Sequence, residues 1–244
     1  MRILLINPNT SRAMTAKIAA AAREVAGPGL EIVAVCPDEG PDAIESHYDE
    51  VFAARAVVDL VEADLAVGGS DAYVIACFGD PGLDAARELT TAPVIGIAEA
   101  AMHVAVLSGR SFGVVTTLGR TLGRARDLLA RYGMERACVS LTGSEVPVLE
   151  LEDTGSDAYE TIATCCEDAV AGGADVVVLG CAGMADLCRS LEGRVGVPVV
   201  DGVAAAVGLA AGMVRMGVGT SKREEYAPPP RPRTAFVLES APAR

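Results

Sequence analysis

Short runs rich in Val and Ile alternate along this chain with longer alanine-rich segments. This alternation is typical of parallel β-α-β units, in which helices cover both faces of a sheet. The chain is therefore expected to be an α/β protein. Strands are predicted at 2–7, 31–36, 72–77, 93–98, 112–117, 137–141, 175–181 and 197–202. Helices are predicted at about 11–26, 48–67, 82–90, 99–108, 120–132, 156–172, 184–191 and 203–216.

The pattern of strands occurs twice. The third predicted strand of each half ends in a cysteine, Cys77 or Cys181, and the fourth opens with a proline, Pro93 or Pro198. An order of four elements rarely repeats by chance, so the sequence indicates an internal duplication. We expect two pseudo-symmetric lobes, each a four-stranded parallel sheet flanked by helices, with the active site in the cleft between them.

The boundaries of the lobes follow from the two halves of the pattern. Residues 1–98 together with 206–244 are expected to form the first lobe, because the last helix and the tail can return to it. Residues 99–205 are expected to form the second lobe. The Pro-rich stretch 226–236 is expected to be an extended arm on the surface.

Hydrophobic residues make up 51% of the chain, a share high enough to raise the question whether any segment crosses a membrane. The longest charge-free apolar stretch near the C-terminus, 202–214, is bounded by Asp201 and Arg215. It is shorter than the roughly 20 residues that span a bilayer. The apolar start of the chain is cut off by the Asn-Pro-Asn at 7–9, too early for a signal peptide. We expect a cytoplasmic protein.

The net charge of −13, without a basic cluster, argues against binding to nucleic acid or to an anionic membrane surface. The seven cysteines form no C-x-x-C pair, so reduced thiols are expected rather than a metal centre or a disulfide framework. His47 and His103 form no zinc-type pair. Lys17, on a predicted helix, and Lys222, in a polar tail, are poorly placed for a pyridoxal-phosphate Schiff base. The sequence therefore predicts no metal and no cofactor.

Cys77 and Cys181 are the candidate catalytic residues. Ligands of open parallel sheets bind beyond the carboxyl ends of the strands, where both cysteines stand beside glycine-rich turns. A thiol that opens a helix is expected to have a lowered pKa. Two such groups on opposite faces of a carbon acid could remove a proton from one face and return one to the other, which inverts a stereocentre.

Packing is the alternative explanation for a cysteine in an apolar segment. Symmetric placement at two strand ends argues against it for Cys77 and Cys181. We retain it for the other cysteines, which are Cys36, Cys138, Cys165, Cys166 and Cys188.

The remaining site candidates are polar or small residues at the same strand ends. The side chains of Asn9, Thr116 and Thr117 are expected to contact the ligand, although turn formation or helix capping would also explain them. Ser46 is expected at the entrance of the cleft. Backbone N–H groups near three further residues are expected to hold an oxyanion. These residues are Gly79, Ala182 and Gly183.

Several motifs together resemble the hydantoin racemase branch of the aspartate/glutamate racemase superfamily, a branch that includes allantoin racemase. They are LLINPNTS, ESHYDE, ACFGDPGLDAARE, PVIGIAEAAMH, VVTTLGRT, LGCAGM and TSKREEYAPP, and they cover nearly the whole chain in order. The resemblance implies two α/β lobes, cofactor-independent racemisation and Cys77 and Cys181 as the acid and base. It also implies a homo-oligomer, a tetramer or a hexamer.

The residues that follow Cys181 distinguish this chain from the amino-acid racemases that it resembles. Those enzymes usually place Thr and then His or Glu after the second cysteine, whereas this chain has Ala182, Gly183 and Met184, without a charge. A neutral ring fits this segment better than a zwitterion does. The related arylmalonate decarboxylases keep only one of the two cysteines, so the pair favours racemisation. The expected substrate is a small molecule, a 5-substituted hydantoin or allantoin, with proton transfer at C5.

Three alternatives stay open from the sequence. The chain could be an aspartate/glutamate-type racemase or another carbon-acid enzyme of the same superfamily. It could be a cysteine hydrolase, which would depend on one thiol and release a ring-opened product. It could also be a non-catalytic module that binds a small molecule.

Overall fold

The computed structural model describes residues 1–152 and 157–230, and within these ranges the strands form two parallel sheets of four. The first sheet has the order β2-β1-β3-β4 and the second the order β6-β5-β7-β8, so the two have the same topology. This confirms the predicted duplicated α/β fold. The strands are β1 (Arg2–Ile6), β2 (Glu31–Val35), β3 (Ala72–Ile75), β4 (Val94–Gly96), β5 (Phe112–Thr116), β6 (Cys138–Gly143), β7 (Val176–Leu179) and β8 (Val199–Asp201).

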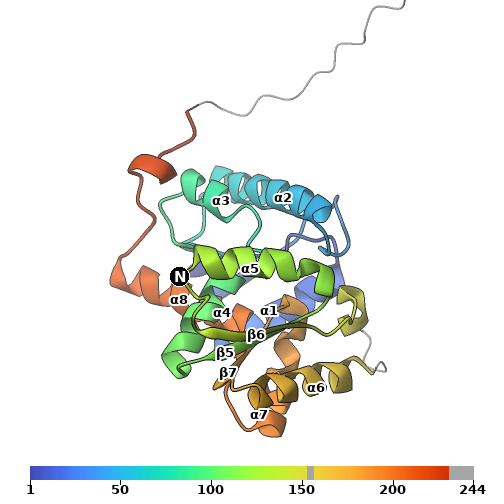
Figure 1. Ribbon diagram of the computed structural model, residues 1–244. Coiled ribbons are helices and arrows are strands. Elements are labelled where there is room, and N and C mark those ends of the chain that lie inside the picture. Colours follow the sequence, from blue (N-terminus) through green and yellow to red (C-terminus); the bar gives the residue numbers. More distant parts are fainter. Residues whose placement is uncertain (153–156, 231–244) are drawn as a thin grey trace, which may run out of the picture.

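Helices cover both sheets, as Figure 1 shows: α2 and α3 lie at the top, α6 and α7 at the bottom, and α4, α5 and α8 between them. The α-helices are α1 (Arg12–Val25), α2 (His47–Ala66), α3 (Leu83–Leu89), α4 (Ile97–Ser108), α5 (Leu122–Arg131), α6 (Ala158–Ala171), α7 (Cys188–Val195) and α8 (Gly202–Met216). Short 3₁₀ helices are η1 (Gly119–Thr121), η2 (Val148–Glu152), η3 (Ala182–Leu187) and η4 (Glu224–Tyr226).

The burial of the strands explains their sequence. The central strands β3, β5 and β7 are buried at every position, which is why they read as unbroken apolar runs. The edge strands β2 and β6 are partly exposed, and their sequences carry polar residues such as Glu31 and Ser140. The apolar character of the chain is thus used in two buried sheets. Among the described residues, no helix combines the length and the hydrophobicity needed to cross a membrane.

The last helix of each half packs on the other half. Helix α4 follows β4 but contacts β7 and β8, whereas α8 follows β8 and contacts β1, β3 and β4. The two helices also pack against each other. We propose on these contacts that the lobes are divided at the boundaries expected from the sequence, 1–98 with 206–244 and 99–205, of which 231–244 lie outside the described residues.

Helices α4 and α8 are capped in the same way by aspartates from different places. In α8, Asp201 accepts hydrogen bonds from Val203 N and Ala204 N, both at 3.0 Å. In α4, the corresponding amides of Ala98 and Glu99 donate to Asp80, which comes from the loop after β3, at 3.0 and 2.9 Å. The cap of α4 therefore ties that helix to the loop that carries Cys77.

Gly96, at the end of β4, makes room for this cap. A Cβ at Gly96 would lie 2.2 Å from the carboxyl carbon of Asp80. Asp80 itself has a φ of 45°, a left-handed conformation that costs energy for a residue other than glycine. The cap must compensate for that strain.

One predicted segment differs in the structure. The helix predicted at 184–191 is a 3₁₀ turn over 182–187 followed by α7 over 188–195. Contacts of η3 with α1, which no local pattern encodes, accompany this tighter turn. Residues 226–230 of the predicted arm are described: the Tyr226 hydroxyl donates to Asp84 at 3.0 Å, and residues 228–230 are exposed. Before the arm, Thr220 N donates to Thr91 O at 2.8 Å. Residues 231–236 of the predicted arm lie outside the described residues.

Substitution of Gly96 by Ala is expected to lower the free energy of unfolding by about 1–3 kcal/mol, because the added methyl displaces a buried cap. The matched control is Gly208→Ala in α8, where a Cβ meets nothing within 4 Å. That variant is expected to be more stable by about 0.4–1 kcal/mol. Urea denaturation measures both. A Gly96→Ala protein as stable as the wild type would contradict the proposed importance of the Asp80 cap.

Candidate active site

The carboxyl ends of both sheets open onto one pocket, which encloses about 820 Å³ of empty space, including solvent at its mouth. Residues of both lobes line it, and every site residue predicted from the sequence is among them. These residues are Cys77, Cys181, Asn9, Ser46, Gly79, Thr116, Thr117, Ala182 and Gly183. The structure thus places the predicted residues together, while their roles in catalysis and binding stay predictions.

The two cysteines stand at corresponding positions of the two lobes. Cys77 follows β3, the strand beside β1, and Cys181 follows β7, the strand beside β5. Each is the first residue of a Cys-x-Gly sequence, and the N–H of that glycine donates a hydrogen bond to the cysteine sulfur. Both side chains are partly exposed. They are accessible to a ligand in the pocket.

Burial determines the acidity of Cys77. It raises the pKa of this thiol to about 12, and the charges of Cys181, Asp80 and Glu50 act in the same direction, whereas the Gly79 N–H acts to lower it. The expected lowering of the pKa by a helix N-terminus is therefore wrong at this position. The reason is local: a turn over 77–80, closed by Asp80 N donating to Cys77 O at 3.0 Å, separates the thiol from α3.

Cys181 is also a weak acid, although it precedes η3 directly. Burial raises its pKa to about 11, while the Gly183 N–H and the ammonium of Lys17 act to lower it. Lys17 Nζ reaches across from α1 to donate to Leu151 O at 2.8 Å and pairs with Asp186 at 2.9 Å. The carboxylate of Glu45 acts in the opposite direction, so a cation and an anion both influence the pKa of Cys181, whereas the charges that act on Cys77 are all anionic.

The side chain of Asn9 offers a hydrogen-bond donor to a ligand. Its Oδ1 accepts from Asn7 Nδ2 at 2.7 Å and from Ser11 N at 3.0 Å, which fixes the orientation of the amide because a backbone N–H requires an acceptor. Among hydrogen bonds of the described residues, none uses Asn9 Nδ2. Asn7, which is 2% exposed, also donates to Thr15 Oγ1 at 2.9 Å. Asn7 therefore orients Asn9, a role that the sequence did not reveal.

The hydroxyl groups predicted for the site differ in whether they already donate a hydrogen bond within the protein. Ser46 caps α2, accepting from Asp49 N at 3.2 Å and donating to Asp49 Oδ2 at 2.7 Å, so its hydroxyl proton is already used. Thr116 Oγ1 donates to Gly180 O at 2.8 Å, next to Cys181. Thr117 is buried beside it and lines the pocket. Ser46 and Thr116 hold the framework of the site, and a ligand can use them only as acceptors.

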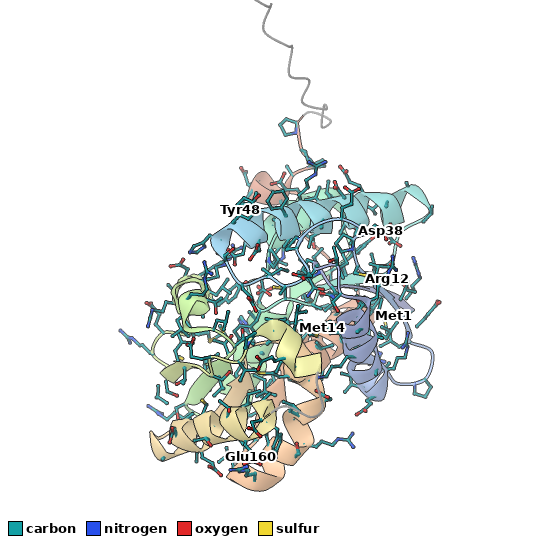
Figure 2. All side chains as sticks on the ribbon, turned by 90° about the vertical axis from the view of Figure 1, so that its right-hand side faces the viewer. Met1, Arg12, Met14, Asp38, Tyr48 and Glu160 are labelled. Atoms are coloured by element: carbon teal, nitrogen blue, oxygen red, sulfur yellow. The ribbon has the colours of Figure 1, made fainter. Side chains whose placement is uncertain are left out.

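An apolar wall and a charged mouth complete the pocket. Met14 and Ile18 of α1 belong to the wall, and Figure 2 shows Met14 between α1 and the yellow segment that contains η2. Further apolar lining residues are Ile44, Phe78, Ala125 and Val148. The charged or polar lining residues that the sequence did not indicate are Glu50, Arg120, Thr121 and Arg124, together with His47, which is exposed at the first turn of α2.

Arg124 of α5, which the sequence did not indicate, makes hydrogen bonds to the turn that carries Cys77. Its Nε and Nη2 donate to Gly79 O at 3.2 and 2.8 Å, and its Nε lies 3.1 Å from Glu50 Oε1. No spacing in the sequence relates Arg124 to residues that lie 45 positions or more before it. In the described part of the chain, no group of three or more His, Cys, Asp or Glu side chains could hold a metal ion.

Comparison with known proteins identifies the family. The model of the Asp/Glu/Hydantoin racemase family matches residues 3–210 of this chain. The chain belongs to the Asp/Glu/hydantoin racemase family. Its members include a hydantoin racemase from Rhizobium meliloti, 43% identical over 230 residues that cover 94% of this chain and 95% of the relative. A hydantoin racemase from Paenarthrobacter aurescens is 41% identical, with 94% and 98% covered.

A solved structure extends the family likeness to three dimensions. The allantoin racemase from Klebsiella pneumoniae superposes with a TM-score of 0.94 at 48% sequence identity, covering 97% of this chain and 96% of that one. The likeness spans both lobes of the Asp/Glu/hydantoin racemase fold and therefore the pocket between them. It agrees with the family that the sequence motifs predicted.

Both thiols are expected to be protonated in the free enzyme at neutral pH, because burial disfavours the thiolate. The measurement is the ultraviolet absorbance of thiolate as the pH rises, taken as the difference between the wild type and Cys77→Ser or Cys181→Ser. Neither difference is expected to appear below about pH 9, and the Cys181 signal should appear before that of Cys77. A full thiolate signal from either residue near pH 7 would contradict the raised pKa values.

Proposed function

We propose that this protein is a cofactor-independent racemase of 5-substituted hydantoins, with allantoin among the candidate substrates. The observation that carries the proposal is a pair of thiols, one from each lobe, on a single pocket. Membership of the Asp/Glu/hydantoin racemase family and the racemase names of close relatives support it. The reaction is an isomerisation at C5 of the ring.

The proposed mechanism uses Cys77 and Cys181 as a base and an acid. The thiolate of one cysteine takes the C5 proton and becomes a thiol, and the electron pair passes into the ring carbonyl as an enolate. The thiol of the other cysteine then gives its proton to the opposite face of C5 and becomes the thiolate. Atoms and charge balance, and the roles exchange for the other enantiomer. A thiol of high pKa suits this chemistry, because its thiolate is a stronger base toward a weak carbon acid.

The backbone donors support the thiolates in this mechanism. The sequence predicts that N–H groups near Gly79, Ala182 and Gly183 hold an oxyanion of the substrate, and those of Gly79 and Gly183 also donate to the cysteine sulfurs. A donor held in place stabilises negative charge wherever it develops, here on whichever sulfur has lost its proton. Asn9 Nδ2 and the pocket-lining Thr117 are then the proposed partners of the ring carbonyls.

The surroundings of Cys181 favour a neutral ring over an amino acid. Ala182, Gly183 and Met184 are buried and carry no charge. The one lysine near this cysteine, Lys17, is engaged with Asp186. A zwitterionic substrate would therefore lack a free partner for its charges beside Cys181.

We further propose that the protein acts in the cytoplasm as a homo-oligomer, a tetramer or a hexamer. Apolar residues exposed on α2 support association, since Tyr48 and Val51 are 73% and 68% exposed and the ring of Phe52 lies 4.9 Å from that of Tyr48. Figure 2 shows Tyr48 at the outer surface of that helix. The acidic net charge of −13 supports the proposal that nucleic acid is not a partner.

Replacement of either Cys77 or Cys181 by Ser is expected to slow racemisation by at least about 100-fold, because each removes one of two proton-transfer groups. The loss of optical rotation of enantiopure allantoin and 5-benzylhydantoin in D₂O, with deuterium at C5 followed by NMR, measures this. The control is Cys165→Ser, on α6 and outside the pocket lining, which should racemise at the wild-type rate.

The same experiment separates the alternatives. Ring-opened product would identify a hydrolase, and binding without C5 exchange would identify a binding module. Racemisation of aspartate or glutamate in place of both rings would identify an amino-acid racemase. Normal racemisation by both single cysteine variants would refute the two-thiol mechanism.

A further inference from the structure

The turn that carries Cys77 is held through both polar groups of Gly79. The Gly79 N–H donates to the Cys77 sulfur, and the Gly79 carbonyl accepts two hydrogen bonds from Arg124, at 2.8 and 3.2 Å. The next amide, Asp80 N, donates to Cys77 O at 3.0 Å and closes the turn. The peptide between Gly79 and Asp80 is therefore fixed on its carbonyl side by Arg124 and on its amide side by Cys77.

Arg124 is itself held in place by Glu50. Its Nε lies 3.1 Å from Glu50 Oε1, and the two side chains are 31% and 21% exposed. Glu50 can approach because residue 79 is a glycine, whose Cβ would lie 2.7 Å from Glu50 Oε1. The planar guanidinium presents Nε and Nη2 in one fork, so a single side chain holds one carbonyl by two bonds. A lysine at this position could not reproduce both.

The corresponding contact on the other side of the pocket is apolar. The turn after Cys181 packs against α1, where a Cβ at Gly183 would lie 2.9 Å from Met14 Cε and 3.0 Å from Leu151 Cδ1. Lys17 adds one ion pair to Asp186, three residues beyond Gly183. The helix that follows the first strand of each sheet, α1 or α5, thus holds the cysteine turn of the other lobe, by an arginine fork at Cys77 and by packing at Cys181.

We infer that Arg124 is a positioning residue for Cys77: it reaches across the cleft, fixes the Gly79 peptide and so aims the Cys77 sulfur at the substrate. This inference rests on the proposed racemase function. The proposed role concerns Cys77 alone, because the hydrogen bonds of Arg124 go to the turn of Cys77 and not to that of Cys181. A change at Arg124 is therefore expected to impair proton transfer on one face of C5 only.

The test uses Arg124→Lys and Arg124→Met, with both enantiomers of the hydantoin substrate in D₂O. Misplacement of a reacting group by about 1 Å can cost roughly 100-fold, so kcat for racemisation is expected to fall about 10- to 100-fold, further for Met than for Lys. KM is expected to change little, since the lost contact is with Gly79. A residue that merely bound the substrate would instead raise KM.

The distinguishing readout is C5 deuteration without inversion. The enantiomer whose proton faces Cys181 should still lose it and regain deuterium on the same face, so its exchange exceeds its racemisation. The enantiomer whose proton faces Cys77 should exchange as slowly as it racemises. In the wild type the two enantiomers should exchange at similar rates.

The matched control is Arg131→Lys. Arg131 lies on the same helix and also bridges the lobes, by an ion pair with Asp84 of α3, and among the described hydrogen bonds and ion pairs none joins it to residues 77–80. This variant is expected to keep wild-type kcat and equal exchange of the two enantiomers. Circular dichroism of every variant checks that the fold is retained.

The outcomes distinguish the inference from the proposed function. A wild type without C5 exchange would refute the racemase proposal. With an active wild type, equal loss of exchange for both enantiomers, a rise in KM alone, or no loss in either Arg124 variant would overturn the positioning role. Unequal exchange in the Arg124 variants, absent from Arg131→Lys, would support it.

Discussion

The buried carboxylate of Asp80 is the interaction on which the rest of the site depends. It caps α4 through two amides and accepts a third hydrogen bond, at 2.7 Å, from the Tyr132 hydroxyl of the other lobe. Burial raises the pKa of Asp80 to about 6, although these hydrogen bonds act to lower it. The same residue closes the turn of Cys77. One residue therefore links a catalytic candidate, through its backbone N–H, with helix α4 and with Tyr132 of the second lobe, through its carboxylate.

Pseudo-symmetry places the two thiols, and departures from it give them different surroundings. The two sheets share one strand order, and Cys77 and Cys181 follow corresponding strands. The charges that act on the pKa of Cys77 are anionic, whereas Cys181 is influenced by a cation, Lys17, and by an anion, Glu45. A proton-transfer pair needs opposite positions but not identical environments.

Burial has opposite effects on the amount of thiolate in this pocket and on its strength as a base. Burial raises the pKa of both thiols and so keeps them protonated at neutral pH. Less thiolate is then present, but the thiolate that forms is a stronger base. Each Cys-x-Gly turn partly offsets the effect of burial, because the glycine N–H donates to the cysteine sulfur and lowers the pKa of the thiol without adding a charged group. At position 183 a Cβ would lie 2.9 Å from Met14 Cε, so glycine lets the turn pack closely against that side chain.

The sequence by itself determined the α/β class, the duplicated strand pattern and the two cysteines at strand ends, because short-range periodicity encodes them. Only the tertiary structure decided which groups surround the thiols. Arg124 and Tyr132 meet residues 45 and 52 positions away, across the cleft, and no local pattern records such a contact. The pKa of each thiol was mispredicted for the same physical reason: acidity follows burial, and burial is a property of the assembled lobes.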